Sequence, residues 1–163
     1  YVSRDGGRNF YQKQPKEAFP VCDFGYIDTA NKTEVRGEGG KTGIFYLALG
    51  DAGLYKLCYD TKTEEIHVKR LTDTGDACYR MGLGVIGEDR DYLTEEKAIY
   101  FCGRLEGEYG FYRTFDEGKS YERLNQDNQM YGEINSIDGD KRKFGRFFLA
   151  TGSRGVLYGE MKR

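Results

Sequence analysis

Three aspartates recur at nearly equal spacing in this chain of 163 residues, and carboxylates are among the groups that serve in acid–base catalysis. Asp5, Asp60 and Asp116 lie 55 and 56 residues apart. Residues 3–10 and 114–121 share the pattern Ser/Thr-x-Asp-x-Gly-x-Asn/Ser-aromatic. An aspartate in such a pattern accepts hydrogen bonds from backbone amides just ahead of it, and the glycine adopts a backbone conformation that other residues resist. We therefore predict that these aspartates stabilise turns and are not a catalytic pair.

The same structural role is predicted for the other residues of the motif. A hydroxyl residue opens the turn, Asp and Gly shape it, and the final aromatic ring packs back over it. The middle copy, at Asp60, lacks the glycine, so we expect a remodelled turn there. The residues with this predicted role are Ser3, Asp5, Gly7, Phe10, Asp60, Thr114, Asp116, Gly118 and Tyr121.

The elements around the motif repeat as well, each time as an apolar strand, a polar turn and a strand that starts with Gly and contains Tyr. Runs of this kind predict antiparallel hairpins, and a period near 50 residues is typical of repeat folds. The fold is therefore predicted to be all-β, a β-propeller with about three four-stranded blades and Asp-box (BNR-repeat) turns. The three hairpins pair residues 44–50 with 53–56, 99–103 with 110–113, and 147–152 with 155–158.

The predicted blades do not complete a propeller. We expect a partial blade at 1–13 and blades at about 20–70, 78–124 and 131–160, the second beginning with an inner strand at 20–27. Closed propellers have about four to eight blades, and an open stack leaves a hydrophobic face bare at each end. We therefore expect an incomplete segment of a larger propeller, completed by other blades of the same protein or by a companion chain.

Composition excludes several classes of function. The net charge is −2, from 25 basic and 27 acidic residues, which argues against a nucleic-acid surface. No apolar run approaches the roughly 20 residues that cross a bilayer, so no membrane association is expected. Four cysteines without a C-x-x-C pair and a single His argue against a zinc site. Buried thiols are the favoured interpretation, and disulfides remain an alternative. No metal or cofactor is expected.

Residues 82–87 spell G-x-G-x-x-G, a motif that binds dinucleotides when it joins a strand to a helix. Here a charged stretch, Glu88 to Lys97, follows, which suits a helical turn or an inserted loop, and then another strand. We therefore interpret the glycines as part of an inner propeller strand, where space is tight.

An ordered series of segments runs through the chain at 35–36, 44–56, 76–84, 110–121, 129–132, 134–140 and 144–159. This series resembles the C-terminal part of the catalytic module of glycoside hydrolase family 74, and the opening residues 2–10 fit as well. Those enzymes are mostly endo-xyloglucanases, built as two seven-bladed propellers in tandem with the substrate cleft between them. The resemblance departs from the family at Phe10 and Tyr121, where Trp is usual.

The resemblance implies a secreted endo-β-1,4-glucanase that acts on xyloglucan or a related β-glucan with inversion. Inversion requires an acid and a base about 6.5–9.5 Å apart. In the family one catalytic aspartate comes from each propeller, and both lie upstream of the matched region. No catalytic residue is therefore assigned here, and the segment alone is not expected to be active; it would supply scaffold and part of the cleft. A non-catalytic carbohydrate-binding propeller and a protein-scaffold propeller remain alternatives.

Five residues are candidates for substrate binding because they fall in the loops before the two later inner strands. Tyr rings stack on sugar faces, while Asp, Arg and Gln bond to hydroxyls. The competing interpretation is that the two tyrosines are packed between blades. The candidates are Asp76, Tyr79, Arg80, Gln129 and Tyr131.

Overall fold

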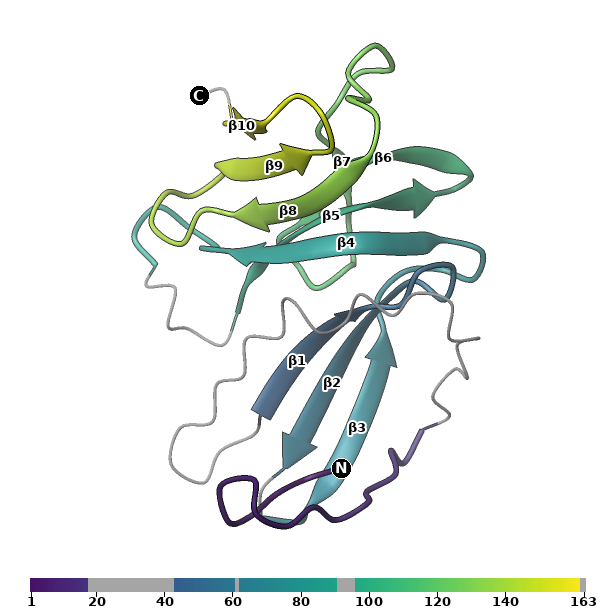
Figure 1. Cartoon of the computed structure of the whole chain (residues 1–163), viewed down its shortest axis with the longest axis vertical. Helices are drawn as coiled ribbons and strands as arrows, with labels where there is room; N and C mark the ends of the chain where they lie inside the picture. The colour runs from purple at the N-terminus through teal and green to yellow at the C-terminus, as the bar shows by residue number, and fades with distance from the viewer. Residues whose placement is uncertain (18–42, 61, 91–95, 162–163) are drawn as a thin grey trace.

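The computed structural model describes residues 1–17, 43–60, 62–90 and 96–161, and these residues form strands, turns and loops without a helix (Figure 1). The prediction of an all-β fold is confirmed. The expected inner strand at 20–27 lies outside the described residues. The strands are β1 (Gly43–Ala48), β2 (Leu54–Asp60), β3 (Glu65–Arg70), β4 (Ala77–Gly84), β5 (Ala98–Leu105), β6 (Glu108–Thr114), β7 (Glu122–Arg123), β8 (Ile134–Gly139), β9 (Phe147–Thr151) and β10 (Val156–Gly159).

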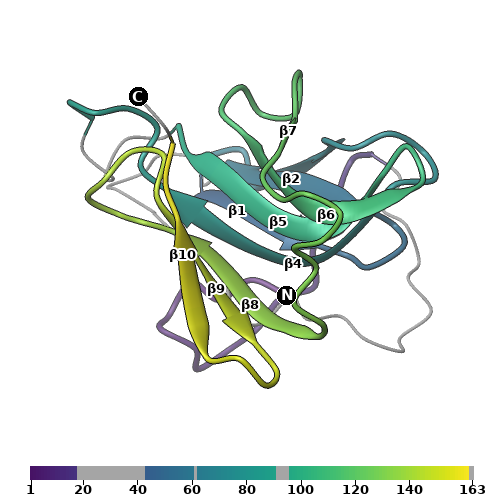
Figure 2. The same cartoon turned by 90° about the horizontal axis from the view of Figure 1, so that it is seen from above.

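The strands form three antiparallel sheets in which each strand pairs with the next along the chain. Their orders are β1-β2-β3, β4-β5-β6-β7 and β10-β9-β8. The sheets follow one another through the molecule in chain order, with β4-β5-β6-β7 in the middle (Figures 1 and 2). Short turns between neighbouring strands suffice because antiparallel pairing needs no crossover.

The middle sheet is covered on both faces, which explains the apolar run at residues 98–103 of β5. Successive side chains of a strand point to opposite faces, so Ile99 and Phe101 pack toward the first sheet while Tyr100 and Cys102 pack toward the third. The first core comprises Tyr46, Ala48, Leu54, Leu71, Cys78, Met81, Leu83, Ile99, Phe101, Leu105 and Tyr112. The second comprises Ala98, Tyr100, Cys102, Phe111, Ile134, Ile137 and Leu149.

Strands β4 and β8 approach each other closely at their glycines. A Cβ at Gly82 would lie 2.4 Å from the Ile137 carbonyl oxygen, and a Cβ at Gly139 would lie 2.6 Å from the Cα of Gly84. Only residues without a side chain permit this backbone approach. The first half of the G-x-G-x-x-G sequence, Gly82 to Gly84, is therefore the close-packed end of β4, as predicted, and not a dinucleotide-binding turn.

The N-terminal residues form a closed turn rather than two full strands. Val2 and Tyr11 exchange backbone hydrogen bonds of 2.8 and 2.9 Å around the first turn motif. Further along, Lys16 donates its amide to the Ile66 carbonyl at 3.0 Å, so this part of the chain runs along β3.

Candidate functional site

The first turn motif is organised by the carboxylate of Asp5. Its Oδ1 accepts hydrogen bonds from the amides of Arg8 at 3.0 Å and Asn9 at 2.9 Å, and from the Ser3 hydroxyl at 2.9 Å. The Gly7 amide donates to Ser3 Oγ at 2.7 Å. The Asp5 carboxylate therefore accepts its hydrogen bonds from residues of its own turn.

The second motif repeats the same set of contacts between β6 and β7. Asp116 Oδ1 accepts from the amides of Lys119 at 3.0 Å and Ser120 at 2.9 Å, and from the Thr114 hydroxyl at 2.8 Å. The Gly118 amide donates to Thr114 Oγ1 at 3.0 Å. Two segments more than a hundred residues apart thus fold identically because the same short pattern directs them.

These contacts lower the pKa of both aspartates. Hydrogen bonds from the backbone amide and then the side chain of Asn9 bring the pKa of Asp5 to about 2. Those from the side chain and then the amide of Ser120 bring the pKa of Asp116 to about 2. Donors that stabilise the ionised form have this effect. Neither group can serve as a general acid near neutral pH.

The middle copy forms a smaller turn. Asp60 Oδ1 accepts from the amides of Lys62 at 2.8 Å and Thr63 at 3.4 Å. The amide hydrogen bond from Lys62 lowers the pKa of Asp60. Here the aspartate accepts from amides two and three residues ahead of it, whereas in the other two copies the amides are three and four residues ahead.

The second turn motif also ties the first and middle sheets together. The Tyr121 hydroxyl donates to the Leu71 carbonyl, just beyond β3, at 2.7 Å. Glu117 forms an ion pair with Lys56 of β2 and accepts a hydrogen bond from the Tyr46 hydroxyl at 3.4 Å. In the first motif, by contrast, Phe10 is exposed. The motif at 114–121 therefore joins two sheets through Tyr121 and Glu117, whereas the motif at 3–10 contacts the first sheet through an ion pair between Arg4 and Glu64.

The five predicted binding residues gather at the opposite end of the sheets, where β4 and β8 begin; we name this end the loop face. Gly50, in the β1–β2 turn, exchanges hydrogen bonds of 2.9 and 2.8 Å with Cys78 of β4. The Gly152 amide, in the β9–β10 turn, donates to the Glu133 carbonyl before β8 at 2.8 Å. Turns from three sheets and the loops before β4 and β8 thus meet at one end, and the turn at 114–121, at the far end of β6, lies away from it.

Asp76 holds the loop face together from inside. It is buried, and its two carboxylate oxygens accept hydrogen bonds from the amides of Asp73 at 3.0 Å and Glu106 at 2.8 Å. The carboxylate thereby joins the loop before β4 to the β5–β6 turn. These contacts direct its oxygens toward the backbone.

Arg80 links the two inner strands. Its Nη1 donates to the Tyr79 carbonyl at 2.9 Å and its Nε donates to the Asn135 carbonyl of β8 at 3.2 Å. The side chain is half-buried. It bridges β4 and β8 at the loop face.

Tyr79 occupies a bulge at the start of β4, where the register between β4 and β5 shifts. Its hydroxyl donates to Asp51 Oδ1, in the β1–β2 turn, at 3.0 Å. Its ring lies 6.5 Å from the ring of Tyr109, at an interplanar angle of 33°. Tyr109 was not among the residues predicted from the sequence, although its place at the start of β6, next to the β5–β6 turn, would have brought it to this end.

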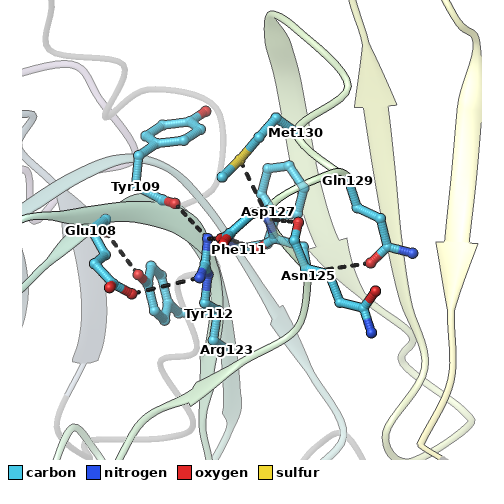
Figure 3. A network of polar contacts seen from close by, with 10 residues as sticks. Glu108, Tyr109, Phe111, Tyr112, Arg123, Asn125, Asp127, Gln129 and Met130 are labelled. Atoms are coloured by element: carbon cyan, nitrogen blue, oxygen red, sulfur yellow. Dashed lines mark hydrogen bonds and ion pairs between the residues drawn. The ribbon is translucent and has the colours of Figure 1, made fainter.

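The loop before β8 is shaped by Asn125 and Arg123 (Figure 3). Asn125 is buried, and its Oδ1 accepts the Phe111 amide at 2.8 Å, which continues the pairing where β7 has ended. Arg123 forms ion pairs with Asp127 at 2.9 Å and Glu108 at 3.5 Å. Both side chains tie the loop to β6.

Gln129 and Tyr131 lie in this loop. The Gln129 side-chain oxygen accepts the Gln126 amide at 3.0 Å. The Tyr131 ring stacks on Phe111 at 6.3 Å between centroids and 8° between planes, with the Tyr131 backbone at φ 56°. Tyr131 thus packs against the second core.

An aromatic row connects the two predicted tyrosines. The ring of Tyr109 lies 6.5 Å from that of Phe111 in an edge-to-face arrangement. This row crosses the loop face from β4 through β6 to the loop before β8. Its rings are, in order, Tyr79, Tyr109, Phe111 and Tyr131.

The described residues contain no group of three or more His, Cys, Asp or Glu side chains placed to hold a metal ion. The described part of the chain also has no helix that could cross a membrane. Cys58, Cys78 and Cys102 are free thiols, and burial raises the pKa of Cys102 to about 11. Cys22 lies outside the described residues.

These features define an all-β repeat protein of stacked antiparallel meanders, with loops of several sheets meeting at one end. No protein-family model matches the chain. It is 30% identical over 161 residues to the xyloglucanase Xgh74A of Acetivibrio thermocellus, covering 98% of the chain and 17% of that protein. It is also 30% identical over 167 residues to the oligoxyloglucan-reducing end-specific xyloglucanase of Emericella nidulans, covering 99% of the chain and 19% of that protein.

Solved structures give the same result. The family 74 xyloglucanase from Xanthomonas campestris matches with a TM-score of 0.61 and 26% identity, over 84% of the chain and 18% of that structure. The family 74 enzyme from Niastella koreensis shares the fold, with a TM-score of 0.59 and 23% identity over 80% of the chain and 18% of that structure. The chain is therefore a relative of the glycoside hydrolase family 74 xyloglucanases, and it spans less than a fifth of their length.

Proposed function

We propose that this chain is a segment of a xyloglucan-active endo-β-1,4-glucanase that hydrolyses its substrate with inversion. The main support is the similarity to xyloglucanases over 98–99% of the chain. In the complete protein the segment supplies scaffold and, through its loop face, part of the substrate cleft. Inversion needs two carboxyl groups held apart across the scissile bond. Asp5 and Asp116 are bound within their turns and are not proposed as this pair; by resemblance to the family, the proposal places the catalytic pair upstream of the segment.

The third sheet supports the presence of further blades. Its outer face carries Phe148, Val156 and Tyr158, all of them exposed, on neighbouring strands where Tyr158 pairs with Phe148. Exposed apolar patches commonly mark surfaces that another element covers. The expected cover is another blade, from the same protein or from a companion chain.

The substrate class favours a secreted protein. Xyloglucan is a polysaccharide of the cell exterior and is too large to enter a cell intact. A secreted enzyme would meet this substrate directly. Secretion is thus part of the proposal.

The proposal is tested with the full-length protein that carries this chain. We expect it to release oligosaccharides from xyloglucan, with the α-anomer of the new reducing end appearing first in proton NMR spectra, because a β-linkage is cleaved with inversion. Initial appearance of the β-anomer would contradict inversion. Binding of xyloglucan without cleavage would favour a carbohydrate-binding propeller, and neither binding nor cleavage would favour a protein scaffold.

The loop before β8 provides a first site-directed test. Replacing Tyr131 with Ala removes a ring that lines the loop face and stacks on Phe111. We expect a KM for xyloglucan raised about three- to tenfold, the effect of one lost aromatic contact. A lowered melting temperature with an unchanged KM would instead assign Tyr131 to the core alone.

A further inference from the structure

The most exposed part of the aromatic row lies at Tyr109. About 36% of Tyr109 is exposed, whereas its neighbour Phe111 is 1% exposed. Tyr79, on the other side of Tyr109, is half-buried. The rings of Tyr79 and Tyr109 are 6.5 Å apart and inclined by 33°, so together they form a shallow apolar surface on the loop face.

Both tyrosine hydroxyls are engaged by the protein. The Tyr79 hydroxyl donates to Asp51 Oδ1 at 3.0 Å, and the Tyr109 hydroxyl is hydrogen-bonded to Cys102 Sγ at 2.8 Å. Burial of Tyr109 and this contact with Cys102 raise the pKa of its phenol. The hydroxyls therefore fix the orientation of the rings, and what the pair presents to solvent is its ring surface.

A polar edge borders the two rings. Arg104 Nη2 lies 3.6 Å from Asp51 Oδ1, and both side chains are exposed. The Asp51 carboxylate accepts hydrogen bonds and the Arg104 guanidinium donates them. The pair can therefore bind sugar hydroxyl groups both as donors and as acceptors. The opposite charges cancel, which suits a neutral glycan rather than an anionic one.

We propose that Tyr79 and Tyr109 form a sugar-stacking subsite for a neutral β-glucan chain, with Asp51 and Arg104 binding its hydroxyls. Pyranose rings have flat apolar faces edged with hydroxyls, and this arrangement of ring surface and polar edge is complementary to them. The inference rests on the proposed function, because it assigns the glycan to that same loop face.

The test uses the full-length protein, soluble tamarind xyloglucan as the probe, and affinity gel electrophoresis together with KM and kcat. Tyr109→Ala is expected to weaken retardation by xyloglucan and to raise KM about three- to tenfold, the loss of one stacking contact. Tyr109→Phe keeps the ring and is expected to stay within about twofold. Arg104→Gln removes the charge at the polar edge and is expected to raise KM as well.

The matched control is Tyr11→Ala, since Tyr11 is an exposed tyrosine beside the first turn motif, away from the loop face. An unchanged affinity in folded Tyr109→Ala, while the unmodified protein binds xyloglucan, would overturn the subsite and leave the proposed function intact. Equal losses in Tyr109→Ala and Tyr109→Phe would also overturn it, because the hydroxyl would then matter rather than the ring. Absence of xyloglucan binding by the unmodified protein would refute both proposals. Should Tyr109→Ala not fold, Arg104→Gln decides, since an unchanged KM there would contradict the polar edge.

Discussion

At the scale of single residues, the turn aspartates illustrate how surroundings decide what a carboxylate can do. Asp5 and Asp116 each collect hydrogen bonds from two successive amides and a hydroxyl. Such donors favour the ionised form and lower the pKa. A catalytic acid needs the opposite environment, one that keeps its proton near neutral pH. The spacing of these aspartates along the chain therefore reflects repeated architecture and not catalysis.

The lowered pKa of Asp116 makes stability depend on pH. A folded-state pKa of about 2, below the ordinary aspartate value of 3.8, contributes stability that is present above the unfolded pKa and is lost as the pH falls from about 4 toward 2. We expect Asp116→Asn to lower the free energy of unfolding at pH 7 by about 1–2 kcal/mol and to flatten its decline in that acidic window. Urea denaturation at several pH values measures both effects.

Asp127→Asn is the control for that experiment, because Asp127 is an exposed surface carboxylate paired with Arg123. Exposed ion pairs contribute little to stability, so this variant should change the unfolding free energy by less than Asp116→Asn does. Equal effects of the two substitutions at pH 7 would argue that the turn contacts of Asp116 carry no special weight.

At the scale of elements, β4 and β8 show why glycine recurs in an inner strand. The two strands belong to different sheets and meet through backbone atoms at Gly82, Gly84 and Gly139. A side chain at these positions would separate the strands and loosen both cores on either side of the contact. The requirement is steric, so apolar character alone does not satisfy it.

Gly82→Ala should therefore destabilise the protein by about 1–3 kcal/mol, the usual cost of overpacking a tight site. The added Cβ would meet the Ile137 carbonyl oxygen at 2.4 Å, and backbone must move to relieve it. Gly152→Ala is the matched control, because its Cβ would have no neighbour closer than 3.4 Å. Thermal denaturation of the two variants compares them, and equal melting temperatures would refute the close approach of β4 and β8.

At the scale of the whole molecule, the three sheets are unequally covered. The middle sheet lies between two cores, while the outer face of the third sheet exposes Val156 at 70% and Tyr158 at 69%. In the proposed propeller another blade covers that face. When the chain is on its own, the outer face of the third sheet therefore exposes apolar side chains to solvent.

This uncovered face predicts self-association of the 163-residue chain when it is produced alone. We expect sedimentation velocity to detect concentration-dependent dimers or larger species, since exposed apolar surface drives association. Replacing both Val156 and Tyr158 with Lys should shift the chain toward monomer. Tyr11→Lys, which adds charge at an exposed aromatic residue outside this face, should leave association unchanged. Equal association in all three proteins would place the contact elsewhere.

Much of the fold followed from short-range patterns. Strand alternation, turn residues and repeat spacing predicted the hairpins at 44–56, 99–113 and 147–158, and the structure has paired strands in each. Hairpins and turns depend on residues that are close together in the sequence, so they can be predicted without knowledge of the tertiary structure. The close packing of Gly82 and Gly84 at the end of β4 was also predictable, because glycine is the residue that a close backbone approach requires.

The site depended on contacts between distant segments. Sequence reasoning selected Asp76 as a ligand for hydroxyls, yet folding brings the amides of Asp73 and Glu106 to its two oxygens. It selected Tyr79 but not Tyr109, which lies 30 residues further along the chain and reaches Tyr79 only through the pairing of β4, β5 and β6. The sequence by itself thus determined the repeated strands and turns, whose causes are local. Only the tertiary structure decided which polar groups are satisfied by the protein and which rings face solvent, because both depend on what packs against them.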